Sequence, residues 1–505
     1  MANAQNLTVE DPEEDDDDEV QSASDKAILE EACERYERIY DDDKDNRDAH
    51  REDFHFVYTP GRQWQADVKA MRDKWKEPSL EFNQLKQFVH QVVNDQRQNR
   101  PGIRVHPASG EASEEVADIV QGMVRGIEYD SKAEAIYDTG YEGSVVGGRG
   151  WWRVVTEYES SESFNQKIVI KSIKDATTVL GDLDYLEPDG RDRRFVFVLE
   201  TVPKEEFKTK WPDAQPLDWD KIDANWRGDD TVVVADYYRR VCKKRTLVMM
   251  SDGAIGWLDT MPTPPEGVRE LARREAEDYS VEWFKIAGGQ QILEKYDVKG
   301  QYIPVICTMG DEALIDGKRI YQGLIRDAKD PQRMLNFGMT QQAVHLALTP
   351  RAPWVAAAGQ IDEFKDIWKN ANRENYAYLP YTPITVDGIA VPPPQRQAPA
   401  SPDQGWLNWT QQQLGMIKST IGMYENSLGA KGNELSGRAI VARERQGDNS
   451  TFHFADNLSR AIALTGEIIV TWLPYYYDTQ RIVHIVGLDG ARKPCLLYTS
   501  DAADE

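Results

Sequence analysis

The sequence predicts an α+β fold in which a mixed region is followed by long helices. In the first 230 residues, short β-rich runs and amphipathic helical runs follow one another without an internal repeat and without regular βαβ alternation, and a mixed region is expected up to residue 400. Beyond it, two long helical patterns occupy 405–424 and 451–473, separated by a stretch that is interrupted by Gly, Asn and Ser. A chain of 505 residues can form two or more structural regions around sizeable cores.

Composition narrows the possible functions. The formal net charge is −26, whereas a protein that grips phosphates is usually basic, so conventional nucleic-acid binding is not predicted. The negative charge does not exclude a channel for DNA, because a channel must let the polyanion pass without binding it tightly. No apolar run reaches about 18 residues, so neither a transmembrane helix nor a membrane partner is expected. The N-terminus does not have the pattern of a secretory signal. The cysteines lack zinc-site spacing, which favours a reducing compartment; they are Cys33, Cys242, Cys307 and Cys495.

The N-terminal part begins with an acidic run. Residues 1–23 contain EDPEEDDDDE, a block of like charges that predicts a disordered tail; the alternative is a tail that docks on a basic partner. From Ser24 we expect a helix whose buried side is formed by Ile28, Ala32, Tyr36 and Ile39.

The elements expected between this helix and residue 402 are read from periodicity and breakers. Helices are expected from about Phe82 to the NDQRQNRPG break and over 112–129, 130–142, 268–278 and 330–348. Strands are expected at 103–106, within the β-rich piece 145–158, at 167–173 and 194–199, as a hairpin-like pair at 231–250, as strand–turn–strand at 283–296 and at 303–306, where Pro304 indicates a sheet edge. Residues 54–58 predict a short apolar stretch before a turn, and 391–402 a stiff extended connector.

Motifs for catalysis are absent from the sequence. The segment 310–319 resembles a phosphate loop, but its glycines are seven apart and Arg319 stands where a hydroxyl would hold Mg²⁺. The carboxylates of 181–190 lack the ligand and glycine positions of a calcium loop, so a surface turn is expected. No HExxH or GxSxG pattern occurs. We therefore predict no enzyme, no cofactor and no metal, and we interpret Trp151 and Trp152 as core rather than as a base-stacking platform.

The two long helical patterns predict an antiparallel arm with a short helical tip between them. In the second pattern Pro474 is expected to stop the helix, and the buried stripe is formed by Phe454, Leu458, Ala461, Thr465, Ile468 and Trp472. The tip carries Arg438, Arg443 and Arg445, which are either a solvated face or a docking site. Because the arm has no catalytic residue set, we interpret it as architectural.

Several segments, in the same order along the chain, resemble the portal proteins of tailed double-stranded-DNA bacteriophages, especially the short-tailed (podovirus) type. They are FNQLKQFVHQVVNDQRQNRP, GRGWWRVVTEY, VVVADYYRRVCKK, IPVI with YQGLIR and DPQRMLN, and SGRAI with RQG, FADN and PYYYDTQRIVHI. Portal proteins form a ring, usually of twelve subunits, at one capsid vertex. DNA enters and leaves through the ring, the terminase motor docks on it, and the tail attaches there.

The resemblance implies a portal fold and a domain plan for this chain. The plan is a disordered acidic tail at 1–23, a mixed α+β wing region at 24–400, a helical stem with a short clip-like tip at 401–473, the start of a further region at 474–494, and a non-native tail at 495–505. Within the stem, 425–450 would be the clip, and Arg438, Arg443 and Arg445 would face the terminase. The residues that line the DNA channel are not identified by the resemblance.

The resemblance also implies partners and a location. The expected partners are further copies of the chain, the terminase motor, capsid proteins, tail or adaptor proteins, and double-stranded DNA that passes without sequence specificity. The expected location is the virion, after assembly in the host cytoplasm. The alternatives are a helical scaffold or adaptor protein of another assembly and, third, a soluble enzyme.

The end of the chain departs from the portal pattern. Residues 495–505 read CLLYTSDAADE, which resembles the translation of a transposon-end adapter used in sequencing libraries, and portal proteins of this type continue well beyond this point. We therefore expect a truncated chain whose last eleven residues lie unpacked at the surface. We also expect the strand that starts at Ile482 to lack a partner after it.

Overall fold

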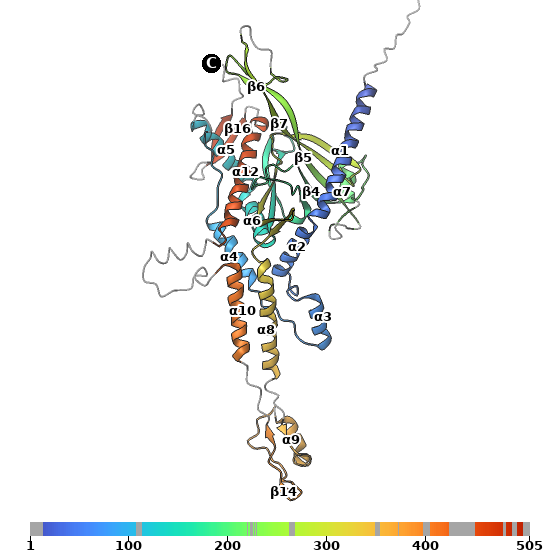
Figure 1. Ribbon diagram of the computed structural model, residues 1–505, viewed down its shortest axis with the longest axis vertical. Coiled ribbons are helices and arrows are strands. Elements are labelled where there is room, and N and C mark those ends of the chain that lie inside the picture. The colour runs from blue at the N-terminus through green and yellow to red at the C-terminus, as the bar shows by residue number, and fades with distance from the viewer. Residues whose placement is uncertain are drawn as a thin grey trace, which may run out of the picture. The chain divides into compact units, whose positions relative to one another are not determined.

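The computed structural model describes residues 14–107, 114–219, 221–222, 226, 228, 230–261, 268–348, 354–371, 373–396, 404–423, 450–477, 481–486 and 492–497 (Figure 1). The chain divides into two compact units. Unit 1 comprises Met1–Asp53, Val89–Leu324 and Thr451–Glu505, and unit 2 comprises Phe54–Phe88 and Ile325–Ser450. Helices and strands are both abundant, which confirms the predicted α+β class.

The first helix of unit 1 has the predicted buried side but an earlier start. In α1 (Glu14–Asp42), Ile28, Ala32, Tyr36 and Ile39 are buried. They pack on the aromatic core of the large sheet, where the Tyr36 ring lies 4.3 Å from that of Trp219. Because α1 begins at Glu14, the prediction of a disordered tail is wrong for 14–23. Residues 1–13 lie outside the described part.

The next helices follow the predicted order. α2 (Lys44–Tyr58) includes 54–58, so the predicted short apolar stretch is in fact the last turn of a helix. α4 (Leu85–Gln98), α5 (Glu114–Ser131) and α6 (Ala133–Gly147) lie where helices were predicted. Residues 103–106 are extended but do not form a ladder strand. The Gln121 side chain accepts a hydrogen bond from the Val105 N–H and donates one to the Ile103 carbonyl, which replaces a neighbouring strand.

The large sheet of unit 1 has the strand order β3-β4-β5-β7-β8, with β6 paired to β5. Its strands are β3 (Val179–Gly181), β4 (Phe195–Pro203), β5 (Thr231–Met250), β6 (Ile255–Trp257), β7 (Glu270–Ala287) and β8 (Gln291–Val298). Two predictions are wrong here: 231–250 is one long strand rather than a hairpin, and 268–278 belongs to a strand rather than a helix. Charged residues of β7 lie opposite charged residues of β5, as Glu277 lies opposite Lys244. This cross-strand pairing outweighs the helical propensity of residues 268–278.

The small sheet of unit 1 has the order β2-β1-β9 and carries the central helix. Its strands are β1 (Arg149–Tyr158), β2 (Gln166–Ile173) and β9 (Val305–Met309), so β9 is an edge strand, as predicted. Trp151 and Trp152 of β1 are 1% and 0% exposed, which confirms a core role and excludes base stacking. α12 (Phe452–Tyr476) contacts all three strands, and the Trp152 indole donates to Thr465 Oγ1 at 3.0 Å.

The predicted stripe of α12 is buried, but Pro474 does not end the helix. All six stripe residues are among those that α12 buries, and Trp472 is 3% exposed. The helix continues to Tyr476 because Pro474 lies in the last turn, where few further backbone bonds are affected. No described helix is long and apolar enough to cross a membrane.

Two hairpins complete unit 1. β10 (Asp311–Ile315) and β11 (Lys318–Gln322) form the first, so the segment 310–319 is a hairpin rather than a phosphate loop. β16 (Arg481–Val486) and β17 (Arg492–Leu497) form the second, in which Val483 pairs with Cys495. The expectation that the strand at 482–486 lacks a partner is therefore wrong, as is that of an unpacked tail for 495–497. Residues 498–505 lie outside the described part.

Unit 2 is built around α8 (Lys329–Leu348) and α10 (Gln404–Ile421), which lie side by side (Figure 1). Residues 338–342 of α8 meet 406–410 of α10, and the 3₁₀ turn η2 (Arg326–Ala328) before α8 also contacts α10, so the pair is antiparallel. The unit also contains α3 (Ala66–Trp75), η4 (Asp362–Phe364), α9 (Lys365–Asn370) and four two-residue strands: β12 (Trp354–Val355), β13 (Thr385–Val386), β14 (Ile389–Ala390) and β15 (Gln395–Arg396). The strands pair as β12–β15 and β13–β14, and β15 falls where an extended connector was predicted.

The predicted antiparallel arm has different partners in the structure. α10 packs along α8 in unit 2, whereas α12 packs against β9, α6 and β2 in unit 1. Each helix thus has its packing partners within its own unit, and the pairing of the helices at 405–424 and 451–473 with each other stays a prediction. Helical periodicity identified both helices but could not tell which apolar side each one meets.

Candidate assembly surfaces and their anchoring network

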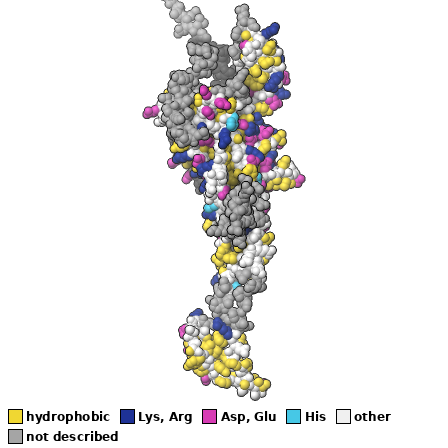
Figure 2. All heavy atoms as spheres, turned by 90° about the vertical axis from the view of Figure 1, so that its left-hand side faces the viewer, with side chains coloured by type: hydrophobic (Ala, Val, Ile, Leu, Met, Phe, Trp, Pro, Cys, Tyr) yellow, Lys and Arg dark blue, Asp and Glu magenta, His cyan; other side chains and the backbone are white. Residues whose placement is uncertain are grey.

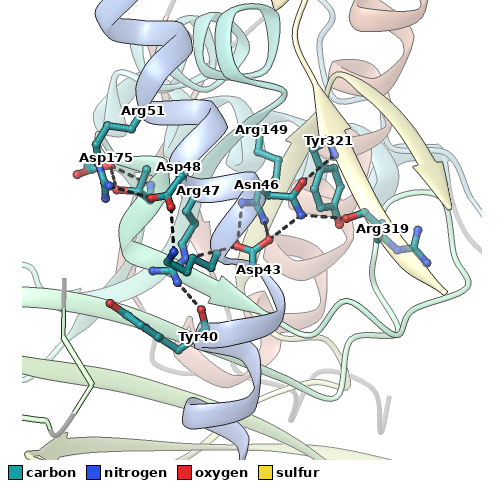
Figure 3. A network of polar contacts seen from close by, with 12 residues as sticks. Tyr40, Asp43, Asn46, Arg47, Asp48, Arg51, Arg149, Asp175, Arg319 and Tyr321 are labelled. Carbon is teal, nitrogen blue, oxygen red and sulfur yellow. Dashed lines mark hydrogen bonds and ion pairs between the residues drawn. The ribbon is translucent and has the colours of Figure 1, made fainter. Parts of the chain in front are cut away.

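A buried polar network ties α2 to the sheets of unit 1 (Figure 3). Asp43, at the junction of α1 and α2, accepts two hydrogen bonds from Arg149, the first residue of β1, each at 2.9 Å. The two side chains are only 1% and 3% exposed. The Arg149 guanidinium also lies over the Tyr321 ring, 4.6 Å from its centroid. A two-pronged pair with an aromatic neighbour fixes the direction of both side chains.

Asn46 extends the network from α2 to the β10–β11 hairpin. Its Nδ2 donates to Asp43 Oδ1 at 3.0 Å and to the Arg319 carbonyl at 2.9 Å, and its Oδ1 accepts from the Tyr321 N–H at 3.1 Å. One side chain thus satisfies two backbone groups of β11 and one carboxylate oxygen, which holds the hairpin against α2.

Aromatic and basic groups close the network on its other side. The Tyr185 and Tyr321 hydroxyls lie 2.9 Å apart, and Arg193 stacks over the Tyr185 ring at 4.4 Å and the Trp151 ring at 5.1 Å. Burial raises the pKa of the nearby Cys307 thiol to about 11, so this sulfur stays protonated at neutral pH. The arrangement anchors α2, β1 and β11 to one another.

In unit 2, a glycine and hydrogen bonds between neutral side chains hold α8 to α10 and to Gln63, which precedes α3. A Cβ on Gly338 would lie 2.3 Å from the Trp409 ring, so the absence of a side chain lets α8 and α10 approach closely. Gln342 Nε2 donates to Thr410 Oγ1 at 3.0 Å. Asn336 Nδ2 donates to Gln63 Oε1 at 2.7 Å, and Gln332 Nε2 donates to Asn336 Oδ1 at 3.0 Å. Neutral groups here take the place that ion pairs have in unit 1.

The outer face of α10 is largely polar and, apart from Lys418 at its edge, uncharged. It consists of exposed residues at helical spacing, namely Asn408, Gln411, Gln412, Gly415 and Ser419. α10 carries Lys418 as its single charged residue, and Met334–Leu348 of α8 contains no Asp, Glu, Lys or Arg. The visible part of this pair is mostly white and yellow in Figure 2. Since 29% of the chain is charged, this depletion is a local property of the helix pair.

The segment 354–396 lies in sequence between the paired helices and exposes apolar side chains. Val355, Tyr378 and Ile389 are 60%, 79% and 74% exposed, and Figure 2 shows hydrophobic groups over much of its visible face. Monomeric soluble proteins rarely expose such groups together, so this surface is suited to contact another protein.

Three earlier predictions about sites have different outcomes. Arg438, Arg443 and Arg445 fall in 424–449, outside the described residues, so their docking role stays a prediction. In the segment 181–190, Asp182 and Asp189 pair with Arg194 and Arg191. The described residues contain no group of His, Cys, Asp or Glu side chains that could hold a metal ion.

Sequence reasoning missed the neutral face of α8 and α10, although the long run without charges was visible in the sequence.

Comparison with known proteins agrees with the portal resemblance. The family described as Phage P22-like portal protein matches residues 33–504. A portal protein of Acyrthosiphon pisum secondary endosymbiont phage 1 is 24% identical over 492 residues, which cover 90% of this chain and 67% of that protein. The family is structural rather than enzymatic, and the match favours a portal protein over the adaptor of another assembly. The chain belongs to the P22-like portal protein family and is a subunit of the portal ring at a capsid vertex of the virion.

Proposed function

We propose that about twelve copies of this chain close into the ring and that the paired helices α8 and α10 of each copy line the DNA channel. The observation that carries the proposal is the uncharged face of this pair in a chain of net charge −26. Assembly takes place in the host cytoplasm before the genome enters, and the DNA that passes is not recognised by sequence.

The physical reason is that a channel lining must interact weakly with DNA of any sequence. Lysine and arginine bind phosphates and release counterions, which would hold the DNA in place. A dense array of carboxylates would repel it. Amide and hydroxyl groups such as those of Gln411, Gln412 and Ser419 exchange hydrogen bonds between water and phosphates at little net cost. The free energy of the DNA therefore changes little as it moves along the channel.

The segment 354–396 is proposed as the part that meets the terminase motor. Because α8 and α10 are antiparallel, this segment leaves and returns at the same end of the helix pair. That arrangement, together with its exposed apolar residues, supports a clip between two stem helices. In this proposal α8 and α10 are the stem, in place of the helices at 405–424 and 451–473, and 354–396 takes the place of 425–450.

The three arginines of 425–450 are tested separately. The variant Arg438→Glu with Arg443→Glu should leave ring formation intact and block genome packaging if these groups dock the motor. Val355→Asp with Ile389→Asp should do the same if 354–396 is the docking surface. Packaging that survives one pair of substitutions and fails with the other identifies the surface that the motor uses.

The channel proposal is tested by adding charge to the neutral face. Gln411→Lys with Gln412→Lys should give rings that retain double-stranded DNA in a salt-dependent way and heads that package far less genome. Ser161→Lys with Phe164→Lys is the matched control, because both side chains are exposed in the β1–β2 turn of unit 1. If heads built from the α10 variant package as much DNA as the control at the same rate, the channel assignment is incorrect.

A further inference from the structure

The long strands of the large sheet extend beyond it as a ribbon. β4 pairs with β5 from Thr231 to Arg239, and β8 pairs with β7 from Val281 to Ala287. Beyond these points, β5 and β7 pair with each other. Among the described strands, the only further partner there is β6, which pairs with β5 from Leu247 to Met249. A narrow ribbon buries little apolar surface by itself and commonly needs a further partner.

The end of this ribbon has an apolar face without a described covering element. Met249 lies opposite Ile255 on β6 and opposite Ala272 on β7, so these side chains share one face. Met249 is 38% and Ile255 63% exposed. Leu247 and Trp257, one pair further along, continue the same face and are partly buried. We call this face, from Leu247 to Met249 with Ile255 and Trp257, the ribbon tip.

Basic groups border the ribbon tip. Arg274 lies opposite Leu247, and Arg269 directly precedes β7; both are exposed, and neither makes an ion pair within the described residues. Arg245, in contrast, is held by Asp259 and Asp278 at 2.6 Å each and stacks on Trp257. The tip therefore combines apolar side chains with two unpaired guanidinium groups, so a complementary surface would be apolar and acidic.

The first turns of α5 form a surface of that kind. Val116 and Ile119 are 58% and 38% exposed, and they lie three residues apart on the helix. Asp118, directly before Ile119 on the helix, is also exposed. Within the described residues this carboxylate has no ion-pair partner. Both α5 and the ribbon belong to unit 1.

We infer that the ribbon tip of one subunit binds the start of α5 of the neighbouring subunit in the ring. A contact between two different surfaces of identical chains is heterologous, and heterologous contacts close into rings. Apolar side chains of Met249 and Ile255 meet Val116 and Ile119, while Arg274 meets Asp118. The inference rests on ring assembly, which the family establishes, and not on the channel lining.

Charge exchange tests the contact. Arg274→Glu and Asp118→Arg, each alone, should raise the protein concentration needed for half-maximal ring formation about fivefold, because attraction becomes repulsion. A chain that carries both substitutions should assemble like the wild type, since every interface again joins opposite charges. Native mass spectrometry over a concentration series measures the ring fraction, and circular dichroism confirms that each monomer is folded. A double variant that assembles no better than the single variants would overturn the inference.

A covalent test is independent of the electrostatic one. In rings of Ile255→Cys with Ile119→Cys, mild oxidation should give a ladder of disulfide-linked oligomers, while each single variant stays monomeric on a denaturing gel. Ile255→Asp should reduce ring yield about tenfold, while Leu186→Asp, at a side chain that is 93% exposed, should not. Absence of the ladder in intact rings, or wild-type ring yield from Ile255→Asp, places the neighbour's contact elsewhere and overturns the inference. The inference is also overturned if Ile255→Asp leaves ring formation unchanged and impairs only tail attachment.

Discussion

The core of unit 1 and the helix pair of unit 2 differ in the kind of polar side chains that hold their elements together. In unit 1, buried charges such as Asp43 are held by an oppositely charged partner, here Arg149. In the helix pair, charges are few and neutral side chains join the helices, as Gln342 joins Thr410. The difference indicates that unit 1 is built for a fixed geometry, and it agrees with our proposal that the helix pair presents a surface that DNA can pass.

The largest expected effect is at the buried pair of unit 1. Arg149→Met removes the guanidinium and leaves the Asp43 carboxylate buried without its partner, which costs about 3–5 kcal/mol. Chemical denaturation of the purified chain measures the free energy of unfolding. The double variant Asp43→Leu with Arg149→Met should recover most of the loss, because no buried charge remains. Equal loss in both variants would show that packing rather than charge pairing holds this site.

Trp472 tests the packing of α12 in the same unit. The side chain is 3% exposed, and its indole N–H donates to the Lys299 carbonyl. Trp472→Ala should cost about 3–5 kcal/mol through the cavity it leaves. The melting temperature and the ring yield should both fall. Thr471→Ala, at the exposed neighbouring position, is the control, and an equal response of both variants would contradict the assigned core role.

A pair of glycines tests the close approach of α8 and α10. Gly338→Ala would bring a Cβ to 2.3 Å from Trp409, so it should destabilise unit 2 by about 1–3 kcal/mol through overpacking. Gly415→Ala meets no atom within 4 Å and should stabilise the helix by up to about 1 kcal/mol. Hydrogen exchange of the α8 and α10 amides measures both. If the two substitutions act alike, the helices are not in tight contact at Gly338.

The smallest expected effect concerns Glu128 of α5, a titrating group in unit 1 that has no counterpart on the neutral face of α10. Burial raises its pKa from 4.5 to about 7, and the Tyr137 hydroxyl donates to it at 3.2 Å. Between these two pKa values the folded chain binds the proton more tightly than the unfolded chain, so stability falls as the pH rises through this range. The loss should be weaker in Glu128→Gln. Parallel stability curves for the two proteins over this range would contradict the shifted pKa.

The fold class and most helices could be predicted from the sequence, because periodicity and helix caps depend on residues close together in the chain. The family could be predicted from short segments in a characteristic order. The sequence did not reveal that β5 and β7 are single long strands, since the charges of 268–278 also suit a solvated helix and only their cross-strand partners decide. It paired α10 with α12 because the two are successive long helices, whereas the partner of α10 is α8, which precedes it by more than fifty residues. The neutral face was missed because absent charges form no motif.

The central claim is that the uncharged face of α8 and α10 lines the channel, and a cryo-electron microscopy map of the assembled ring tests it directly. We expect Asn408, Gln411, Gln412 and Ser419 of every subunit to point into the central hole with no side chain of a neighbour covering them. A map in which these residues are buried between subunits or face away from the hole, with charged side chains forming the wall, would contradict the claim.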